Sequence, residues 1–262
     1  MKLYELYEEQ LDELEMKGLR RAAGAAALAG ILATNPSPTQ DDSMDTQPKV
    51  AQSQEHTLPK NLGQMEVAEK KEAFLNFIIP IANKLNTNII TDREFVLGIK
   101  SNNNVIKSDN TRLKQLMTTY KTDNIDTLLA RLDIIPVSLI AAQAAIESGW
   151  GTSRFARQGN SLFGQRDYSG GGIKPKDATG FTVAKFENIA DSVKSYMRNL
   201  NTFPHYQGFR KLRKNMRDKG NAIDSTKLAN QLVKYSERGN DYIRDVKSVI
   251  NYNKLQKFDQ LI

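Results

Sequence analysis

A single glutamate follows an apolar stretch in the middle of the chain, and its position suits proton transfer. Residues 137–146 are apolar almost all round, so we predict a buried helix there, ended by Gly149 and Gly151. Glu147 lies at the C-terminal end of this helix and close to Trp150. Apolar surroundings and the negative end of the helix dipole both raise the pKa of a carboxyl group. An acid that keeps its proton near neutral pH can donate it to the leaving oxygen of a glycosidic bond.

A structural role for Glu147 is the alternative interpretation. In that role the carboxylate pairs with an arginine such as Arg154 or Arg157 and anchors the loop that follows the helix. The residues themselves leave both roles open.

The supply of reactive side chains excludes several other chemistries. The 262-residue chain contains no cysteine and two histidines, His56 and His205. Cysteine nucleophiles, thiolate zinc sites and disulfide scaffolds are therefore excluded. A zinc site made of two histidines and a carboxylate would need both histidines, and His56 lies in a linker-like stretch. We expect no metal and no cofactor.

The helix before Glu147 must be positioned by other helices, and hydrophobic periodicity predicts several upstream. They cover residues 65–85, 92–99, 113–120 and 125–132, with polar turns at 101–104 and 107–110. Pro80 lies inside the first of them, so we expect a kink or a break there.

The first 64 residues differ in composition from the rest. Residues 1–33 combine an acidic amphipathic stretch with an Ala/Gly-rich run, which suggests a signal, an anchor or an assembly tag. The run has 12 residues, from 22 to 33, whereas a membrane-spanning helix needs about 20. Residues 34–64 are polar and proline-rich, and we predict a disordered linker. The remaining residues, 65–262, form the predicted globular domain, with a helical subregion at 65–133.

Charge divides the chain into two unequal halves. Residues 1–135 carry 16 basic and 19 acidic side chains, a net charge of −3, whereas residues 136–262 carry 21 and 11, a net charge of +10. The basic half indicates an anionic partner, which could be nucleic acid, a membrane surface or an acidic polymer such as the bacterial cell wall. The basic string FRKLRKNMRDK, residues 209–219, is expected to form a solvated helix face that could hold the protein on an anionic surface. No nucleic-acid-binding module accompanies it, so no nucleic-acid partner is expected.

The chain resembles the bacterial glucosaminidase domain, glycoside hydrolase family 73, in the stretch AAQAAIESGWGTSRFARQGNSLFGQ. More narrowly, it is similar to the Bax-like bacterial branch of that family. The similarity continues in VAKFENIADSVKSYMRNLNTFPHYQGFRKLR and LVKYSERGNDYIRDVKSVINYNKL, and upstream in KKEAFLNFIIPIANKLN. It covers roughly residues 66–262, about three quarters of the chain.

The resemblance implies a fold and an activity. The fold is of the α+β class, predominantly helical and lysozyme-like, with a small β-lobe beside the catalytic helix. The activity is hydrolysis of β-1,4 bonds on the N-acetylglucosamine side of the peptidoglycan glycan. Glu147 occupies the family's general-acid position, and Tyr196 and Tyr235 match cleft-lining or structural aromatics. The chain departs from the branch after Gln165, where Arg166-Asp167-Tyr168 stands in place of the expected aromatic residue and cysteines.

The sequence does not identify the second catalytic group. Asp177 is the first candidate, because it precedes the predicted strand 180–186 where the family's β-lobe acid would fall. Glu237 is the second candidate, followed by Asp167 and Glu187. Such a carboxylate would act either as a base that holds water or as a nucleophile. A third route needs no protein carboxylate, because the N-acetyl group of the substrate can act as the nucleophile.

Aromatic and amide side chains near these acids could contact sugar rings and acetamido groups. We predict a substrate-binding set of Trp150, Asn160, Phe163, Gln165, Tyr196 and Tyr235.

The function expected from this sequence is that of an endo-β-N-acetylglucosaminidase that acts on peptidoglycan. A lytic transglycosylase and an inactive wall-binding or virion structural protein are the alternatives. The expected location is the cell envelope, the periplasm or the exterior, or a virion if the protein is a phage lysin. The unusual N-terminus favours a phage origin slightly over a cell's own wall-remodelling enzyme.

Overall fold

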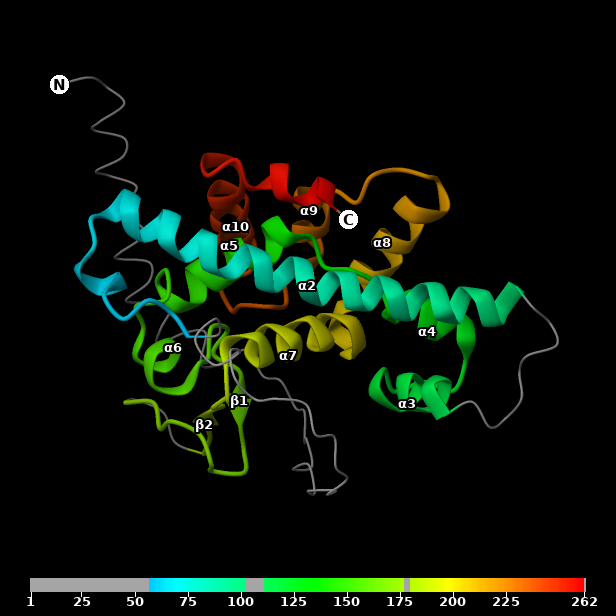
Figure 1. Cartoon of the computed structure of the whole chain (residues 1–262), viewed down its shortest axis with the longest axis horizontal. Helices are drawn as coiled ribbons and strands as arrows, with labels where there is room; N and C mark the ends of the chain where they lie inside the picture. The colour runs from blue at the N-terminus through cyan, green and yellow to red at the C-terminus, as the bar shows by residue number, and fades with distance from the viewer. Residues whose placement is uncertain (1–56, 102–110, 177–179, 262) are drawn as a thin grey trace, which may run out of the picture.

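The protein is predominantly helical, as predicted, and carries one small antiparallel sheet (Figure 1). The computed structural model describes residues 57–101, 111–176 and 180–261. Its helices are α2 (Val67–Ser101), α3 (Thr111–Thr119), α4 (Ile125–Arg131), α5 (Val137–Ser148), α6 (Arg154–Gly159), α7 (Ile189–Thr202), α8 (Gln207–Asp218), α9 (Ser225–Ala229) and α10 (Asn240–Tyr252). Short 3-10 turns complete the chain: η1 (Leu62–Gln64), η2 (Pro204–Tyr206), η3 (Asn230–Leu232) and η4 (Leu255–Leu261).

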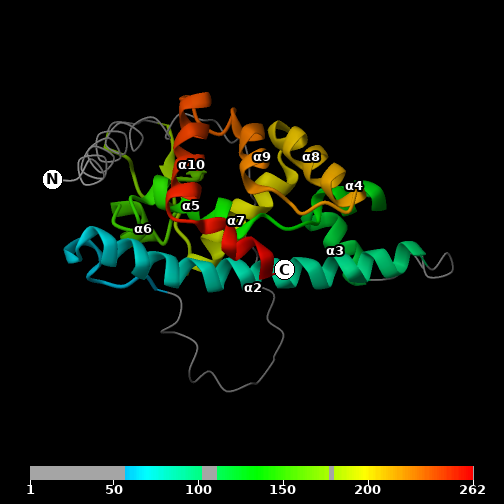
Figure 2. The same cartoon turned by 90° about the horizontal axis from the view of Figure 1, so that it is seen from above.

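Helix α2 runs the full width of the molecule, with α3 and α4 at one end and α6 at the other (Figures 1 and 2). The sequence predicted two helices here, 65–85 and 92–99, with a kink or break at Pro80. The break and the division into two helices were wrong, because one helix of 35 residues continues through Pro80. Pro80 is exposed, so water can solvate the carbonyl that its missing N–H leaves without a helical partner.

Helix α5 lies at the centre of the fold, and its prediction from the apolar run is confirmed. It packs against α2, α10 and η4, and all of its residues are buried except Ile146 and Glu147. Asp259 of η4 stabilises its beginning by accepting hydrogen bonds from Ser138 N at 2.8 Å and Ser138 Oγ at 2.6 Å. Gly149 ends the helix in the left-handed conformation, with φ of 59°.

The sheet is smaller than the sequence predicted. Strands β1 (Arg166–Asp167) and β2 (Thr182–Val183) pair antiparallel, and Ile173 adds one isolated bridge to Val183. The predicted strand over 180–186 is therefore reduced to two residues. Gly172 permits this close approach, since a Cβ atom there would lie 2.1 Å from the carbonyl oxygen of Val183.

The apolar interior forms two clusters along α2. The larger surrounds α5, and the smaller joins the C-terminal part of α2 to α3 and α4 through residues such as Val96, Leu113 and Leu128. Asp133 lies in the segment between α4 and α5, which connects the smaller cluster to the larger one along the chain, and it is only 2% exposed.

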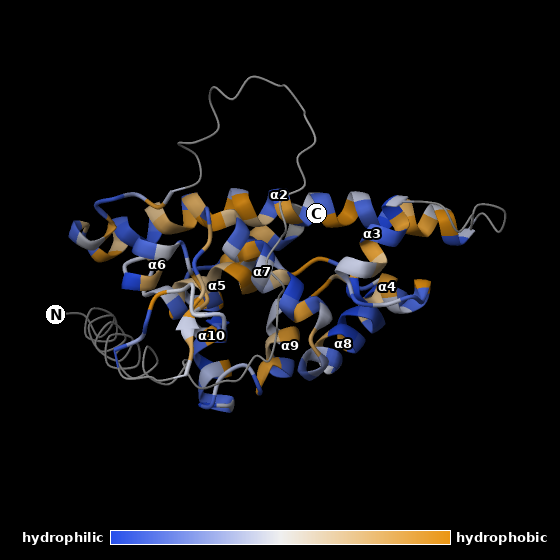
Figure 3. Ribbon diagram, turned by 90° about the horizontal axis from the view of Figure 1, so that it is seen from below, coloured by the Kyte–Doolittle hydropathy of each residue, from blue (hydrophilic) through white to orange (hydrophobic). Residues whose placement is uncertain are grey.

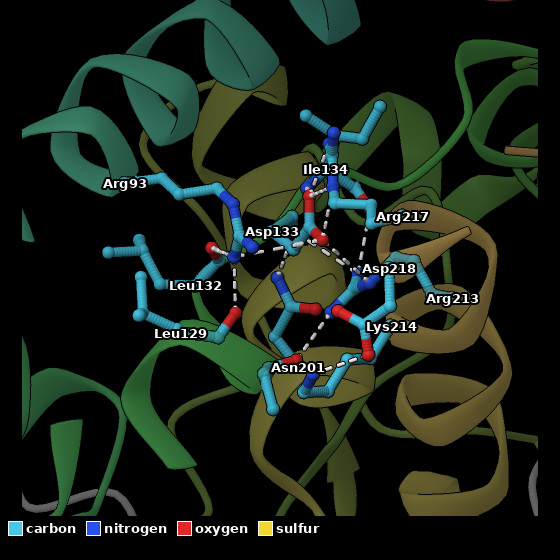
Figure 4. Close-up of polar contacts among 11 residues, drawn as sticks. Arg93, Leu129, Leu132, Asp133, Ile134, Asn201, Arg213, Lys214, Arg217 and Asp218 are labelled. Carbon is cyan, nitrogen blue, oxygen red and sulfur yellow. Dashed lines mark hydrogen bonds and ion pairs between the residues drawn. The ribbon is translucent and has the colours of Figure 1, made fainter. Parts of the chain in front are cut away.

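Three arginines surround Asp133 (Figure 4). Arg217 donates to both carboxylate oxygens at 2.6–2.9 Å, and Arg213 and Arg93 lie within 3.7 and 3.8 Å. Arg213 is fully buried and also donates to the carbonyl oxygens of Asp133, Ile134 and Ala130. This set of contacts, the Asp133 cluster, ties α8 and α2 to the segment that leads into α5.

Helix α8 contains the basic string 209–219 and is mostly hydrophilic, whereas α5 is mostly hydrophobic (Figure 3). The sequence predicted a solvated basic face here, and this is correct only in part. Arg210, Arg213 and Arg217 lie on the inward side and bind backbone oxygens or Asp133. Lys211 and Lys214 remain exposed. The arginines are therefore structural, because their donors are used inside the protein.

The N-terminal predictions lie mostly outside the described residues. The structure does not describe residues 1–33, residues 34–56 of the predicted linker, or residues 102–110, which hold the polar turns predicted at 101–104 and 107–110 apart from Ser101. Residues 57–64 are described, and Leu62 is only 1% exposed in the core. The ordered part thus begins before residue 65. Within the described ranges, no helix is long and apolar enough to cross a membrane.

Candidate active site

Glu147 lies in the last turn of α5 and is half-buried. The chain turns sharply after it, since Gly149, Trp150 and Gly151 all have positive φ angles of 59°, 56° and 80°. This turn ends the helix immediately after the glutamate and leads the chain away from it. The carboxyl group is therefore held at the end of a rigid, buried helix.

Burial and the negative charge of Glu147 both raise the pKa of four tyrosines from later elements: Tyr196, Tyr206, Tyr235 and Tyr242. Their rings contact one another around Tyr235. Tyr242 stacks on Tyr235 at 5.4 Å, and Tyr196 and Tyr206 each lie 6.3 Å from it between ring centroids. We call these four residues the tyrosine cluster. It brings α7, η2, α10 and the turn after η3 to the end of α5.

A chain of hydrogen bonds connects this cluster to Glu147. The Tyr196 hydroxyl donates to Gln143 Oε1, and Gln143 Nε2 donates to the Tyr242 oxygen at 2.8 Å. Tyr242 in turn forms a side-chain hydrogen bond with Glu147. The three side chains that lead to Glu147 are all buried.

Burial raises the pKa of Glu147 to about 7, as the apolar helix predicted. The Tyr242 hydrogen bond and the positive charge of Arg238 act in the opposite direction and lower it. Burial and the negative charge of Glu147 raise the pKa of Tyr242 well above its ordinary value. At neutral pH the tyrosine cluster is thus protonated, and Glu147 lies near the midpoint of its titration.

The alternative pairing of Glu147 with Arg154 or Arg157 is not present. Arg154 donates to the carbonyl oxygen of Lys174, and Arg157 donates to that of Lys60, each at 2.7 Å. Arg238, the cation that acts on Glu147, forms an ion pair with Asp245 at 2.6 Å. The carboxyl group of Glu147 is consequently stabilised by a phenol and not by a bound guanidinium.

The predicted substrate-binding aromatics lie in different environments. Trp150 is 4% exposed and packs edge-on against Phe74 of α2, with ring centroids 5.8 Å apart. Phe163 is 5% exposed and stacks on Tyr196 at 4.0 Å. Tyr235 is half-buried and belongs to the tyrosine cluster. Of these aromatics, the structure places Tyr196 and Tyr235 beside Glu147.

The two predicted amides have local backbone partners. Asn160 ends α6 in the left-handed conformation and donates to the carbonyl oxygens of Phe186 and Glu187, both at 3.0 Å. Gln165 Nε2 reaches the carbonyl oxygen of Ser192 at 3.5 Å, while its Oε1 is buried without a hydrogen-bond partner.

The candidates for a second acid are spread over the structure. Asp177 lies outside the described residues. Glu237 and Glu187 are exposed, and Asp167 of β1 accepts hydrogen bonds from Ser169 and Thr182. Hydrogen bonds from Ser169 lower the pKa of Asp167 despite some desolvation. Among the described residues, no carboxylate acts on the pKa of Glu147.

Four residues near Glu147 were not predicted from the sequence: Gln143, Tyr206, Arg238 and Tyr242. Gln143 carried a signal that could have identified it, because a glutamine in a helix that is buried all round needs hydrogen-bond partners. In the described part of the chain, no group of three or more His, Cys, Asp or Glu side chains could hold a metal ion.

Comparisons with known proteins place the chain in a family. The glucosaminidase family, described as mannosyl-glycoprotein endo-beta-N-acetylglucosaminidase, matches residues 122–255. The chain is 35% identical over 182 residues to Protein bax of Escherichia coli strain K12, and the match covers 66% of each protein. The crystal structure of the catalytic domain of the autolysin Auto from Listeria monocytogenes is similar with a TM-score of 0.42 and 18% identity. That match covers 74% of this chain and 90% of the Auto chain.

The family match spans more than half of the chain and includes α5, Glu147 and every member of the tyrosine cluster. The chain belongs to the glucosaminidase family.

Proposed function

We propose that this protein hydrolyses β-1,4 glycosidic bonds of the peptidoglycan glycan strand, on the N-acetylglucosamine side, with Glu147 as the general acid. The observation that carries the proposal is the raised pKa of Glu147, about 7, at a half-buried position beside four tyrosines. An acid with this pKa holds its proton near neutral pH and still releases it readily. Membership of a family described as endo-beta-N-acetylglucosaminidases supports the type of bond.

In the proposed reaction, Glu147 gives its proton to the bridging oxygen while the bond from that oxygen to the anomeric carbon breaks. The electron pair of the bond stays with the leaving oxygen, and positive charge develops on the sugar ring. Negative charge appears at the same time on the Glu147 carboxylate. The hydrogen bond from Tyr242 and the charge of Arg238 stabilise that carboxylate in the transition state.

The group that attacks the anomeric carbon has three candidates in this proposal: Asp177, Glu237 and the N-acetyl group of the substrate. A carboxylate that acts as a base on water gives inversion of the anomeric configuration, whereas a carboxylate nucleophile or the N-acetyl group gives retention after water opens the intermediate. The configuration of the first product therefore separates the inverting route from the two retaining routes. Loss of activity in Asp177→Asn or Glu237→Gln would then identify the residue.

Digestion of purified sacculi tests the proposal. The full-length protein, Glu147→Gln and the control Glu94→Gln are incubated with sacculi, and the soluble products are reduced and analysed by mass spectrometry. Glu94 is an exposed acid on α2 and serves as the matched control. We expect wild type and Glu94→Gln to release fragments that end in reducible N-acetylglucosamine, and Glu147→Gln to release almost none.

The products also separate the alternatives. Anhydro-muramyl ends would identify a lytic transglycosylase, and binding of wild type to sacculi without release of new ends would indicate an inactive wall-binding or virion protein. Undiminished release by Glu147→Gln would refute the role of this residue.

We further propose that exposed lysines in and directly after α8 hold the protein on anionic wall polymers, and that it works in the cell envelope. Lys211, Lys214 and Lys219 are exposed, and Lys214 pairs with Asp218 at 2.6 Å. Salt screens such surface charges over about 10 Å at 0.1 M. Retention on walls that persists unchanged in high salt would remove this role.

A further inference from the structure

Gln143 lies one helical turn before Glu147 on α5 and is fully buried. Its side-chain amide has two different ends, since the oxygen only accepts hydrogen bonds and the nitrogen only donates them. The oxygen accepts from the Tyr196 hydroxyl, and the nitrogen donates to the Tyr242 oxygen at 2.8 Å. Both ends are therefore occupied by hydroxyls of the tyrosine cluster.

This arrangement determines which acceptor the Tyr242 hydroxyl can donate its hydrogen bond to. The Tyr242 oxygen already accepts a hydrogen bond from Gln143, so its own O–H is free to donate to Glu147. A reversed amide would present its oxygen to Tyr242, which would then give its proton to Gln143 instead. Tyr196 disfavours that reversal, because its hydroxyl would lose the amide oxygen as its hydrogen-bond acceptor.

We propose that Gln143 is a positioning residue that acts through Tyr242 and commits the phenol proton to the Glu147 carboxylate. In the proposed reaction, which this inference presupposes for its catalytic meaning, negative charge appears on Glu147 when it gives up its proton. The committed phenol proton is then already in place to stabilise that charge, without rearrangement. Gln143 itself contacts neither the carboxyl group nor the sugar in this account.

The titratable and charged groups that interact with Glu147 come from several elements. Tyr196 comes from α7, Tyr206 from η2, Tyr235 from the turn after η3 and Tyr242 from α10. Burial raises the pKa of each tyrosine, so all four stay neutral between pH 5 and 9. The other charged group that acts on Glu147 is the guanidinium of Arg238, which lowers its pKa. Among these groups, Glu147 is therefore the one expected to change its protonation state near pH 7.

The experiment follows the Glu147 carboxyl carbon by NMR in the full-length protein, with the signal assigned by its absence from Glu147→Gln. This readout needs no substrate, so its outcome is independent of the proposed enzyme activity. The variants are Gln143→Met, which keeps a similar volume without the amide, Tyr242→Phe and the double variant. Asn86→Leu is the matched control, because Asn86 is also a buried amide with both ends bonded, to the backbone of Ile135.

We expect Tyr242→Phe to raise the titration midpoint of Glu147 by about one to two pH units, because a hydrogen bond to a charged group is lost. Gln143→Met raises it in the same direction by about half a unit or more. The double variant titrates like Tyr242→Phe, since Gln143 acts only through that phenol. Asn86→Leu lowers stability and leaves the midpoint unchanged.

Two results would overturn the inference. An unchanged midpoint in Gln143→Met reduces this residue to a packing role, and additive shifts in the double variant show that it acts on Glu147 by another path. If Gln143→Met does not fold, Tyr196→Phe replaces it, because loss of the Tyr196 donor lets the amide reverse. An upward shift in Tyr196→Phe is then expected, and its absence contradicts the relay.

Discussion

Asp133 lies in the segment that leads into helix α5 and is buried, whereas Glu147 lies in the last turn of that helix and is half-buried. The two carboxyl groups also differ in their neighbours. Burial raises the pKa of both. At Asp133 three arginines more than compensate, and the pKa falls below its usual value. At Glu147 a tyrosine hydrogen bond and one more remote guanidinium compensate only in part, and the pKa remains at about 7.

The comparison shows that partners, more than depth, decide what a buried acid does. Asp133 is held as an anion and joins α2, α8 and the start of α5, so it serves the structure. Glu147 keeps an exchangeable proton, so it suits catalysis. Helix α5 connects the two, and the fixed end at Asp133 helps to position the reactive end at Glu147.

The largest effect is expected from Glu147→Gln. Removal of the general acid should lower the rate of sacculus digestion by about 10²–10⁴-fold. The variant should fold normally, because the amide does not place a charge in the buried site. Circular dichroism and thermal unfolding check the fold beside the activity measurement. A rate within twofold of wild type would show that Glu147 is not the general acid.

Asp133→Asn should instead affect stability. The substitution leaves the buried Arg213 without its counter-charge, and breaking a buried ion pair in this way costs about 3–5 kcal/mol. Urea unfolding measures the loss. A destabilisation below about 1 kcal/mol would show that the ion pairs of Asp133 contribute no more to stability than a surface salt bridge does. It would also remove the contrast with Glu147.

The adjacent pair Arg213 and Lys214 separates inward from outward basic residues on α8. Arg213→Met removes three donors to buried carbonyl oxygens and should cost about 2–3 kcal/mol. Lys214→Met removes an exposed ion pair with Asp218 and should change stability by less than about 0.5 kcal/mol. Equal losses in the two variants, measured by urea unfolding, would contradict the assignment of Arg213 to the interior.

The two carboxyl groups should also give stability opposite pH dependences. The folded pKa of Glu147 lies above its ordinary value of 4.5, so its contribution to stability is full below pH 4.5 and is lost as the pH rises towards 7. The folded pKa of Asp133 lies below 3.8, so its contribution is present above that pH and is lost as the pH falls further.

Each slope is at most about 1.4 kcal/mol per pH unit. Unfolding of wild type, Glu147→Gln and Asp133→Asn from pH 3 to 8 measures both. Glu147→Gln should abolish the decline between pH 4.5 and 7, and Asp133→Asn should weaken the loss in acid. Parallel curves for all three proteins would show that neither carboxyl group has a shifted pKa.

Much of the helical framework was predictable, because local patterns encode it. Apolar spacing located α3 and α4, and the continuous apolar run with Gly149 located α5. Pro80 was misleading, since its effect on α2 depends on whether that side of the helix faces water or core. The spacing of Arg210, Arg213 and Arg217 marks one helix face as clearly as apolar residues would, but their charge suggested solvent. Asp133, the partner of Arg213 and Arg217, is about 80 residues away, and no local pattern reveals it.

The candidate site was predictable at Glu147 and only in part around it. Glu147 stands out as an acid at the end of a buried helix, and the direction of its pKa shift follows from that position. Tyr196 and Tyr235 were expected from the family resemblance, but the tyrosines come from four separate places along the chain, so only packing shows that Tyr242 reaches the carboxyl group. Trp150 is three residues from Glu147 in the sequence and was expected to lie close to it. The backbone at Trp150 is left-handed, and its ring packs against Phe74.

The central claim is that Glu147 supplies the proton near neutral pH, and the pH dependence of kcat/KM tests it most directly. This parameter reports ionisations of the free protein. With soluble glycan fragments at low concentration, we expect the wild-type value to fall above pH 7 with a single ionisation near 7, and the residual activity of Glu147→Gln to lack that limb. A wild-type profile that stays flat to pH 9, or a limb that persists in Glu147→Gln, would contradict the account.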